Sequence, residues 1–262
     1  MTNKNKVLIS SSACKDIKAS AQLARELDLG IEISRLPIYK TKGMTVNDAI
    51  EILKNDLGDF NNRITLHAMF SDINIAGQDY LLQEIGKLRY QQSFEVGKAL
   101  GADTILFHTG YKGTKHYGSI KSFQKSFILF WKDFIKEFEN NGIIAVIENV
   151  FETSPDFCLK LFNEINSPNL KLALDAGHVN LYAHNTEVTE WINAYGNNLY
   201  HMHIHNNFRT NDDHSNLENG TLDYRKILTI IKEKNINPSF VFEMFTEENI
   251  RKSLKYFNEI ME

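Results

Sequence analysis

The sequence contains few of the residues that break a chain into separate domains. Only four prolines occur among the 262 residues, and no Gly/Ser-rich stretch or run of like charges interrupts the chain. Such compositions are typical of linkers and disordered tails. We therefore expect a single domain that spans residues 1–262.

Cysteine and long hydrophobic runs are also scarce. Two cysteines, Cys14 and Cys158, are too few for a disulfide framework, so we expect both to be reduced and structural. The first apolar stretch, residues 7–9, is far shorter than a signal segment or a membrane span. We therefore expect a cytoplasmic protein without a membrane partner.

An excess of positive charge is missing too. The net charge is -4 and the pI is about 6.2. This balance provides no global attraction to a phosphate backbone, which argues weakly against a nucleic-acid partner and leaves local basic patches open.

What the sequence does contain is a regular alternation of two patterns. Eight short apolar runs recur: VLIS from residue 7, IEIS from 31, ITLHA from 64, TILFH from 104, IIAVIEN from 143, LKLALD from 170, LYHMHI from 199 and SFVFEM from 239. Longer segments such as 80–100 and 122–140 lie between them, and their apolar residues return every three or four positions. Eight β-α units in 262 residues predict an α/β fold, a parallel eight-stranded (β/α)8 TIM barrel. The periodicity alone also allows a doubly wound sheet.

Local signals mark several helix boundaries. Ser154 followed by Pro155 predicts a capped helix start, and Thr246 precedes a Glu-rich first turn. Gly30, Gly101 and Gly142 stand at helix-to-strand junctions, where we expect a left-handed backbone.

Potential metal ligands or acid/base groups end six of the apolar runs. They are His67, His108, Glu148, Asp175, His203 and Glu243, and His178, Asp212 and His214 lie just beyond strand ends. The carboxyl ends of the strands of a parallel barrel meet at one mouth, so we expect these side chains to be neighbours. Imidazole and carboxylate ligands favour Zn²⁺ or Mn²⁺, with Mg²⁺ and Co²⁺ as further candidates.

Each of these residues also has a plainer interpretation. A salt bridge would explain the carboxylates, and a hydrogen-bonded structural role would explain a single histidine. From composition alone, Asp212 and His214 in the stretch NDDHSN belong to a solvated loop.

The order and spacing of these residues resemble the xylose isomerase-like superfamily of TIM barrels almost from end to end. The resemblance rests on LHAMF, ALGADTILFHTG, VIENV, LALDAGHVN, MHIHNN and VFEMF. It implies that Glu148, Asp175, His203 and Glu243 hold one divalent metal. His203 with Asn206 fits the strand-seven pattern of the superfamily better than His205, which stays as an alternative, and His201 would lie deeper.

The resemblance implies first a sugar or sugar-phosphate isomerase or epimerase, with a small-molecule substrate and, as one option, a homo-oligomeric state. Glu148 and Glu243 would move protons next to a metal-bound carbonyl. The spacing of ketose 3-epimerases implies that His178 and Arg209 bind substrate oxygens. The further candidates for substrate binding are His67, His108 and Glu32, although an internal ion pair explains Glu32 equally well.

The resemblance implies as an alternative an endonuclease IV-like hydrolase that cleaves phosphodiesters in abasic DNA with several zinc ions. In that case all nine residues that end or follow the strands would bind the zinc ions. Against it stand SSSACK after the first strand, DAGH in strand six, and a loop after strand seven that carries one arginine among several acids. A non-catalytic barrel that keeps its metal site is a third alternative. Phe70, Tyr111 and Phe151 would stack on a sugar or pack under loops.

Overall fold

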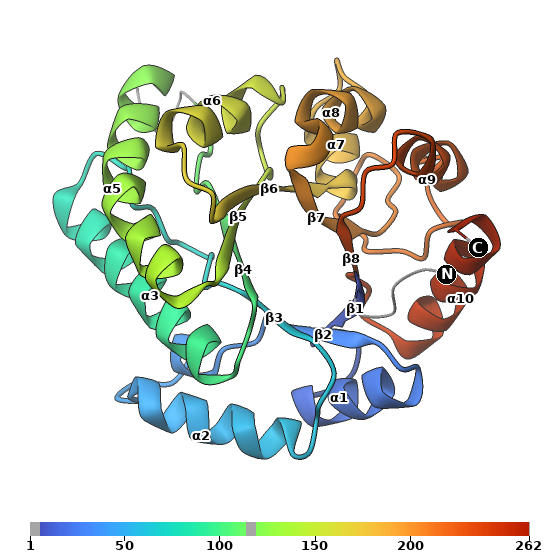
Figure 1. Ribbon diagram of the computed structural model, residues 1–262, viewed down its shortest axis with the longest axis horizontal. Coiled ribbons are helices and arrows are strands. Elements are labelled where there is room, and N and C mark those ends of the chain that lie inside the picture. Colours follow the sequence, from blue (N-terminus) through green and yellow to red (C-terminus); the bar gives the residue numbers. More distant parts are fainter. Residues whose placement is uncertain (1–5, 114–118, 262) are drawn as a thin grey trace.

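A computed structural model describes residues 6–113 and 119–261 and has the predicted (β/α)8 fold (Figure 1). Eight parallel strands form a closed barrel in sequence order, and β1 pairs with β8. The strands are β1 Val7–Ser10, β2 Gly30–Ile33, β3 Ile64–His67, β4 Thr104–His108, β5 Ile144–Glu148, β6 Leu170–Asp175, β7 Leu199–Ile204 and β8 Ser239–Phe242. The helices are α1 Ile17–Glu26, α2 Val46–Leu57, α3 Tyr80–Ala99, α5 Ile120–Asn141, α6 Asp156–Ile165, α7 Ala176–Tyr182, α8 Val188–Tyr195, α9 Tyr224–Glu233 and α10 Glu247–Met261.

The strands are apolar because most of their residues are buried on both faces, inside the barrel and against the helices. Leu106, Val146 and Ala173 form a small cluster of their own, separate from the larger core. The register aligns the polar strand ends: His108 pairs with Glu148 across β4 and β5, and Asp175 pairs with His203 across β6 and β7. The barrel therefore brings the predicted site residues to the same level of the mouth.

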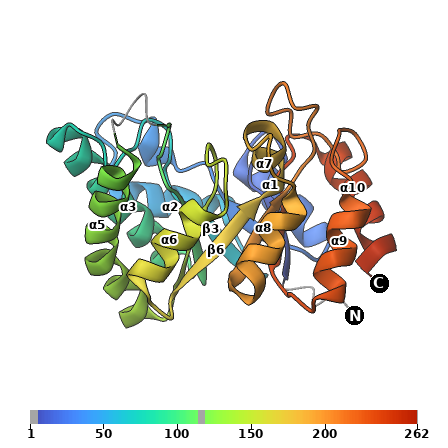
Figure 2. The same cartoon turned by 90° about the horizontal axis from the view of Figure 1, so that it is seen from above.

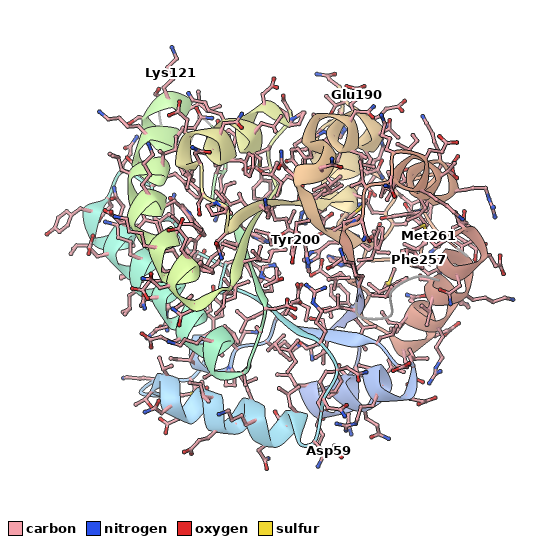
Figure 3. All side chains as sticks on the ribbon, viewed as in Figure 1. Asp59, Lys121, Glu190, Tyr200, Phe257 and Met261 are labelled. Carbon is pink, nitrogen blue, oxygen red and sulfur yellow. The ribbon has the colours of Figure 1, made fainter. Side chains whose placement is uncertain are left out.

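The helices pack on the barrel through their apolar sides, and side chains fill the space between the two layers (Figure 3). Phe257 of α10 lies with its ring centroid 5.0 Å from that of Phe240 and 5.5 Å from that of Phe242. Cys158 is buried in α6, Cys14 is half-buried after β1, and both are free, as the sequence predicted. Among the residues described, no helix is long and apolar enough to cross a membrane.

Most of the predicted helix signals are confirmed. Ser154 Oγ accepts a hydrogen bond from the backbone N of Asp156 at 3.2 Å, although Pro155 and not Ser154 occupies the N-cap position of α6. Thr246 Oγ1 accepts one from Asn249 N at 3.3 Å ahead of α10. Gly101 and Gly142 are left-handed, with φ of 73° and 66°.

The prediction for Gly30 is wrong. Gly30 is the first residue of β2, and the left-handed residue at this junction is Asp28, with φ of 56°. A Cβ atom on Gly30 would lie 2.8 Å from the carbonyl oxygen of Arg63 and 2.8 Å from Leu8 Cγ. Glycine is therefore needed here for the close approach of neighbouring strands and not for its backbone conformation.

We predict that Gly30→Ala lowers the free energy of unfolding by about 1–3 kcal/mol, because the Arg63 carbonyl belongs to the backbone entering β3 and cannot move aside freely. Chemical denaturation measures this change. Gly77→Ala is the matched control, since its new methyl group would meet mainly the end of the flexible Asn74 side chain. Equal stability of the two variants would contradict the packing argument.

Candidate metal centre

The side chain of His203 lies at the centre of the polar cluster in the barrel mouth. Its Nδ1 atom is 2.7 Å from Glu148 Oε1, 3.1 Å from Glu243 Oε2 and 3.8 Å from Asp175 Oδ2. The four residues that the sequence assigned to a metal therefore converge on one atom, although they come from four different strand ends.

The atoms at this point fit a divalent cation. Both carboxylate oxygens of Glu148 and Nδ1 of His203 are buried, and none of these atoms makes a hydrogen bond within residues 6–113 and 119–261. Leaving an ionised carboxylate buried without a donor or a cation is costly. One imidazole nitrogen with several carboxylate oxygens is a ligand set that suits Zn²⁺ or Mn²⁺.

Glu32 orients His203 from below. Its Oε1 atom is 2.8 Å from His203 Nε2, its Oε2 atom is 2.8 Å from His201 Nε2, and Thr65 donates a hydrogen bond to Oε2 at 3.1 Å. When Nε2 of His203 donates to Glu32, the lone pair on Nδ1 faces the three carboxylates. Glu32 is fully buried, and the ion pair considered from the sequence is present; substrate binding by Glu32 stays a prediction.

Two further histidines flank Glu148 on the side of β3 and β4. His108 Nε2 is 2.8 Å from Glu148 Oε2, and His67 Nε2 is 3.8 Å from the same oxygen. The other ring nitrogen of His67 lies 2.8 Å from the carbonyl oxygen of Ala68. That contact fixes the ring so that Nε2 points towards Glu148, and the three residues form a second group that could hold a metal.

A third group lies on the opposite side of the mouth. Asp212 Oδ2 is 3.4 Å from His178 Nε2 and 3.2 Å from His214 Nε2. Nδ1 of His178 is 3.0 Å from the carbonyl oxygen of Asn149, and Nδ1 of His214 contacts the carbonyl oxygen of Glu243. Both rings are therefore anchored through the backbone and turned towards Asp212.

The loop that carries Asp212 and His214 is folded back over the mouth, so the solvated loop expected from composition is wrong for His214, which is 8% exposed. Asn206 Nδ2 donates to the carbonyl oxygens of Leu217 and Leu222 at 2.8 and 3.1 Å, and its backbone pairs with Ser215. A Cβ atom on Gly220 would overlap with the Asn206 side chain. These contacts connect Asn206 with residues 215–222 and hold the two ends of the loop together.

His205 is a neighbour that the sequence argument underrated. Its Nε2 atom lies 3.2 Å from Asp175 Oδ2, and its ring stacks on that of His214 with centroids 3.9 Å apart. Alternate residues of a strand share a face, so His205 faces inwards together with His203. A Cβ atom on Gly177 would overlap with the His205 ring, so this glycine makes the space for it.

Glu152, four residues after Glu148, was not singled out either. It is 2% exposed, and its carboxylate accepts hydrogen bonds from the Thr109 hydroxyl and from Val150 N. Burial raises its pKa. No local pattern distinguishes this glutamate from a solvent-exposed one.

The acidic residues raise the pKa of three histidines of the cluster, His178, His203 and His214. Burial lowers the pKa of His178, but Asp175 and Asp212 raise it more, to about 10. Burial likewise lowers the pKa of His214, and Asp212 and Glu243 raise it to about 9. Burial raises the pKa of Glu243, but the neighbouring His203 lowers it to about 2. The cluster thus attracts positive charge, which a metal ion would supply in place of these protons.

The remaining predicted residues lie in different surroundings. Arg209, on the loop after β7, donates from Nε to Asn180 Oδ1 at 3.0 Å and lines a cavity of about 190 Å³ between α7, α8 and α9. Phe70 is 44% exposed and its ring centroid lies 4.8 Å from those of His67 and His108. Phe151 lies beside Tyr182, whereas Tyr111 is buried against other aromatic rings, one of the two uses considered from the sequence.

The fold and this cluster define a (β/α)8 barrel with a candidate metal centre at the carboxyl ends of its strands. Residues 21–260 match the xylose isomerase-like TIM barrel family, and the chain belongs to that family.

Known relatives are similar to this chain over most of its length. An uncharacterized protein of Methanocaldococcus jannaschii is 24% identical over 198 residues, which are 73% of this chain and 67% of the relative. The crystal structure of a D-tagatose 3-epimerase-like protein is 21% identical and has a TM-score of 0.79, with 98% of each chain covered. A D-psicose 3-epimerase structure is 12% identical, with a TM-score of 0.77 and coverage of 98% of this chain and 99% of that one. At these identities the solved structures establish the shared fold.

We predict that Glu148→Gln lowers the affinity for Zn²⁺ or Mn²⁺ by at least about 100-fold, because it removes a charged ligand from the middle of the cluster. Isothermal titration of metal-stripped protein measures the affinity. Glu164→Gln, an exposed position on α6, should bind as the unaltered protein does. Unchanged affinity in Glu148→Gln would remove this residue from the centre.

Proposed function

We propose that this protein is a divalent-metal-dependent isomerase or epimerase that acts on sugars or sugar phosphates. The observation that carries the proposal is the convergence of Glu148, Asp175 and Glu243 on His203 Nδ1. The similarity to a D-tagatose 3-epimerase-like protein and to a D-psicose 3-epimerase supports the sugar substrate.

In this proposal the four converging residues hold the metal, and Glu148 and Glu243 also transfer protons. A bound divalent ion would polarise the carbonyl group of the substrate. The Glu243 side chain is 15% exposed, whereas that of Glu148 is fully buried, so a substrate that enters the mouth would meet Glu243 before Glu148. In an epimerisation one carboxylate takes a proton from the carbon next to the carbonyl, and the other, which must first have taken up a proton from solvent, returns that proton to the opposite face.

The neighbouring histidines lower the pKa of both carboxylates. His203 holds the pKa of Glu243 at about 2 against the effect of burial, and His203 and His108 hold that of Glu148 well below its usual value. Without substrate or metal, both groups are therefore ionised at neutral pH, and either of them can accept a proton.

Other side chains around the mouth would orient the sugar. His178, His67 and His108 offer ring nitrogens to its oxygens, and the face of Phe70 suits the apolar C–H face of a sugar ring. Arg209 would bind substrate oxygens through its guanidinium group, which Asn180 holds in place.

We predict that Glu243→Gln reduces turnover of a ketose at least about 1000-fold, because the neutral amide cannot accept the proton. NMR in D₂O measures this step directly, as deuterium enters the substrate at the carbon that exchanges. Glu218→Gln, an exposed position in the loop after β7, is the control and should keep full exchange. Exchange at the unaltered rate in Glu243→Gln would exclude this carboxylate as the base.

A second candidate function is phosphodiester hydrolysis with two or three zinc ions. Three histidines favour it: His67, His178 and His214 each have one ring nitrogen held by a backbone carbonyl and the other turned towards a carboxylate. This is the arrangement of histidines that bind metals in proteins. Several close metal ions would generate a hydroxide and stabilise both oxygens of a displacement.

The number of metal ions per chain distinguishes the two functions. For the sugar enzyme we expect one tightly bound ion, measured by elemental analysis of the purified protein, with anomalous scattering to locate it beside His203. Two or three zinc ions that engage His67, His178 and His214 would instead favour the hydrolase and direct assays to abasic DNA.

A further inference from the structure

Asn149 directly follows Glu148 at the carboxyl end of β5 and is fully buried. Its Nδ2 atom donates a hydrogen bond to the carbonyl oxygen of Asp175 at 3.1 Å, and its Oδ1 atom accepts one from the backbone N of Asp175 at 2.9 Å. One side chain therefore binds both backbone groups of a residue at the next strand end.

These two hydrogen bonds continue the sheet beyond its backbone ladder. The register of β5 and β6 ends with the pair Glu148 and Ala173, two residues before β6 itself ends. A side-chain amide offers a donor and an acceptor, as a peptide group does, so that of Asn149 takes the place of a further β5 peptide opposite Asp175. The position of Asp175 relative to Glu148 is therefore set by a side chain as well as by the strands.

Asn149 also holds the helix that follows β6. Strand β6 leads directly into α7 (Figure 2), and Asp175 is the N-cap of this helix, where its Oδ1 atom accepts a hydrogen bond from His178 N at 2.7 Å. The carbonyl oxygen of Asn149 lies 3.0 Å from Nδ1 of His178. Nδ1 donates in this contact, because a carbonyl oxygen can only accept. The other ring nitrogen, Nε2, then faces Asp212 at 3.4 Å.

We infer that Asn149 is a positioning residue of the metal centre. It sets the distance between Glu148 and Asp175 and the direction in which His178 presents Nε2. Its side-chain amide acts through the backbone of Asp175 and not on a ligand atom. The inference rests on the proposed function, because it treats Glu148 and Asp175 as metal ligands.

The hydrogen bonds at this position require an amide of this length. A carboxylate at residue 149 would turn one oxygen towards the carbonyl oxygen of Asp175, where two acceptors repel each other. A leucine of similar shape would leave the N–H and C=O groups of Asp175 without these partners, which is costly for buried groups. Glutamine is one methylene longer and would not fit a fully buried site without displacing its neighbours.

Zinc titration of metal-stripped variants tests the inference. We expect Asn149→Leu to lower the affinity for Zn²⁺ by about 10- to 100-fold, because Asp175 is no longer held beside Glu148. Asn149→Ser, whose smaller side chain leaves room for a bridging water, should have an affinity between those of Asn149→Leu and the unaltered protein. The serine variant also provides the answer if the leucine variant does not fold.

Asn169→Leu is the matched control. The Nδ2 atom of Asn169 donates to the carbonyl oxygens of Ile143 and Phe138 at 2.8 and 3.4 Å, at the opposite end of β6 from Asp175. This substitution removes hydrogen bonds to the backbone too, so the unfolding midpoints of both leucine variants should fall, whereas only Asn149→Leu should lose zinc affinity. Unchanged affinity in the folded Asn149 variants, or an equal loss in Asn169→Leu, would overturn the inference.

A measurement without metal separates the inference from the proposed function. In metal-free protein with isotope-labelled histidine, NMR measures how fast the Nδ1 proton of His178 exchanges with solvent. We expect this exchange to be at least about 10-fold faster in the Asn149 variants, because the carbonyl that accepts the proton is no longer held in place, and unchanged in Asn169→Leu. Equal exchange in all these proteins would overturn the inference. Faster exchange in Asn149 variants of a protein that binds no zinc would instead contradict the proposed metal and leave the positioning of His178 in place.

Discussion

The structure of the mouth depends on buried acidic groups whose charge is balanced by neighbouring histidines. Among the described residues, Glu32, Glu148 and Asp175 form their ion pairs with histidines. Histidine is a compensating partner that can release its proton and bind a metal with the same nitrogen. His203 contacts acidic groups through both ring nitrogens, since one nitrogen faces Glu32 and the other faces the carboxylates above it. The barrel makes this possible by holding the rings on rigid strands.

The sequence was sufficient to predict the barrel and the proximity of the residues at its strand ends. All eight apolar runs are strands, because a strand buried on both faces consists of consecutive apolar residues and differs clearly from the amphipathic helices around it. A charged residue at the end of such a run is conspicuous, as Glu148 and Asp175 illustrate. The rule that the carboxyl ends of parallel strands meet at one mouth then brought residues from distant positions together. The roles of these residues in catalysis are proposals that rest on this geometry.

What the sequence could not predict depends on contacts between distant segments. The burial of His214 was not predicted, because the loop that carries it is held by contacts of Asn206 and His178 that no local pattern reveals. Gly30 reads as a helix exit because its neighbours resemble one, whereas its real constraint is the backbone of the next strand. The His205 ring occupies space that is free because residue 177 is a glycine. The sequence alone does not reveal which side chain packs against a glycine.

The closure of the loop after β7 has a consequence for protein engineering. Its two ends are tied by Asn206, its turn requires Gly220, and its tip is attached to the end of β8 through the contact of His214 with the Glu243 carbonyl. The loop is therefore a module whose parts must be transferred together. A chimera that exchanged only the residues facing the mouth would lose the supports that hold them, whereas a graft that included Asn206 and Gly220 would carry its own framework into another barrel of this family.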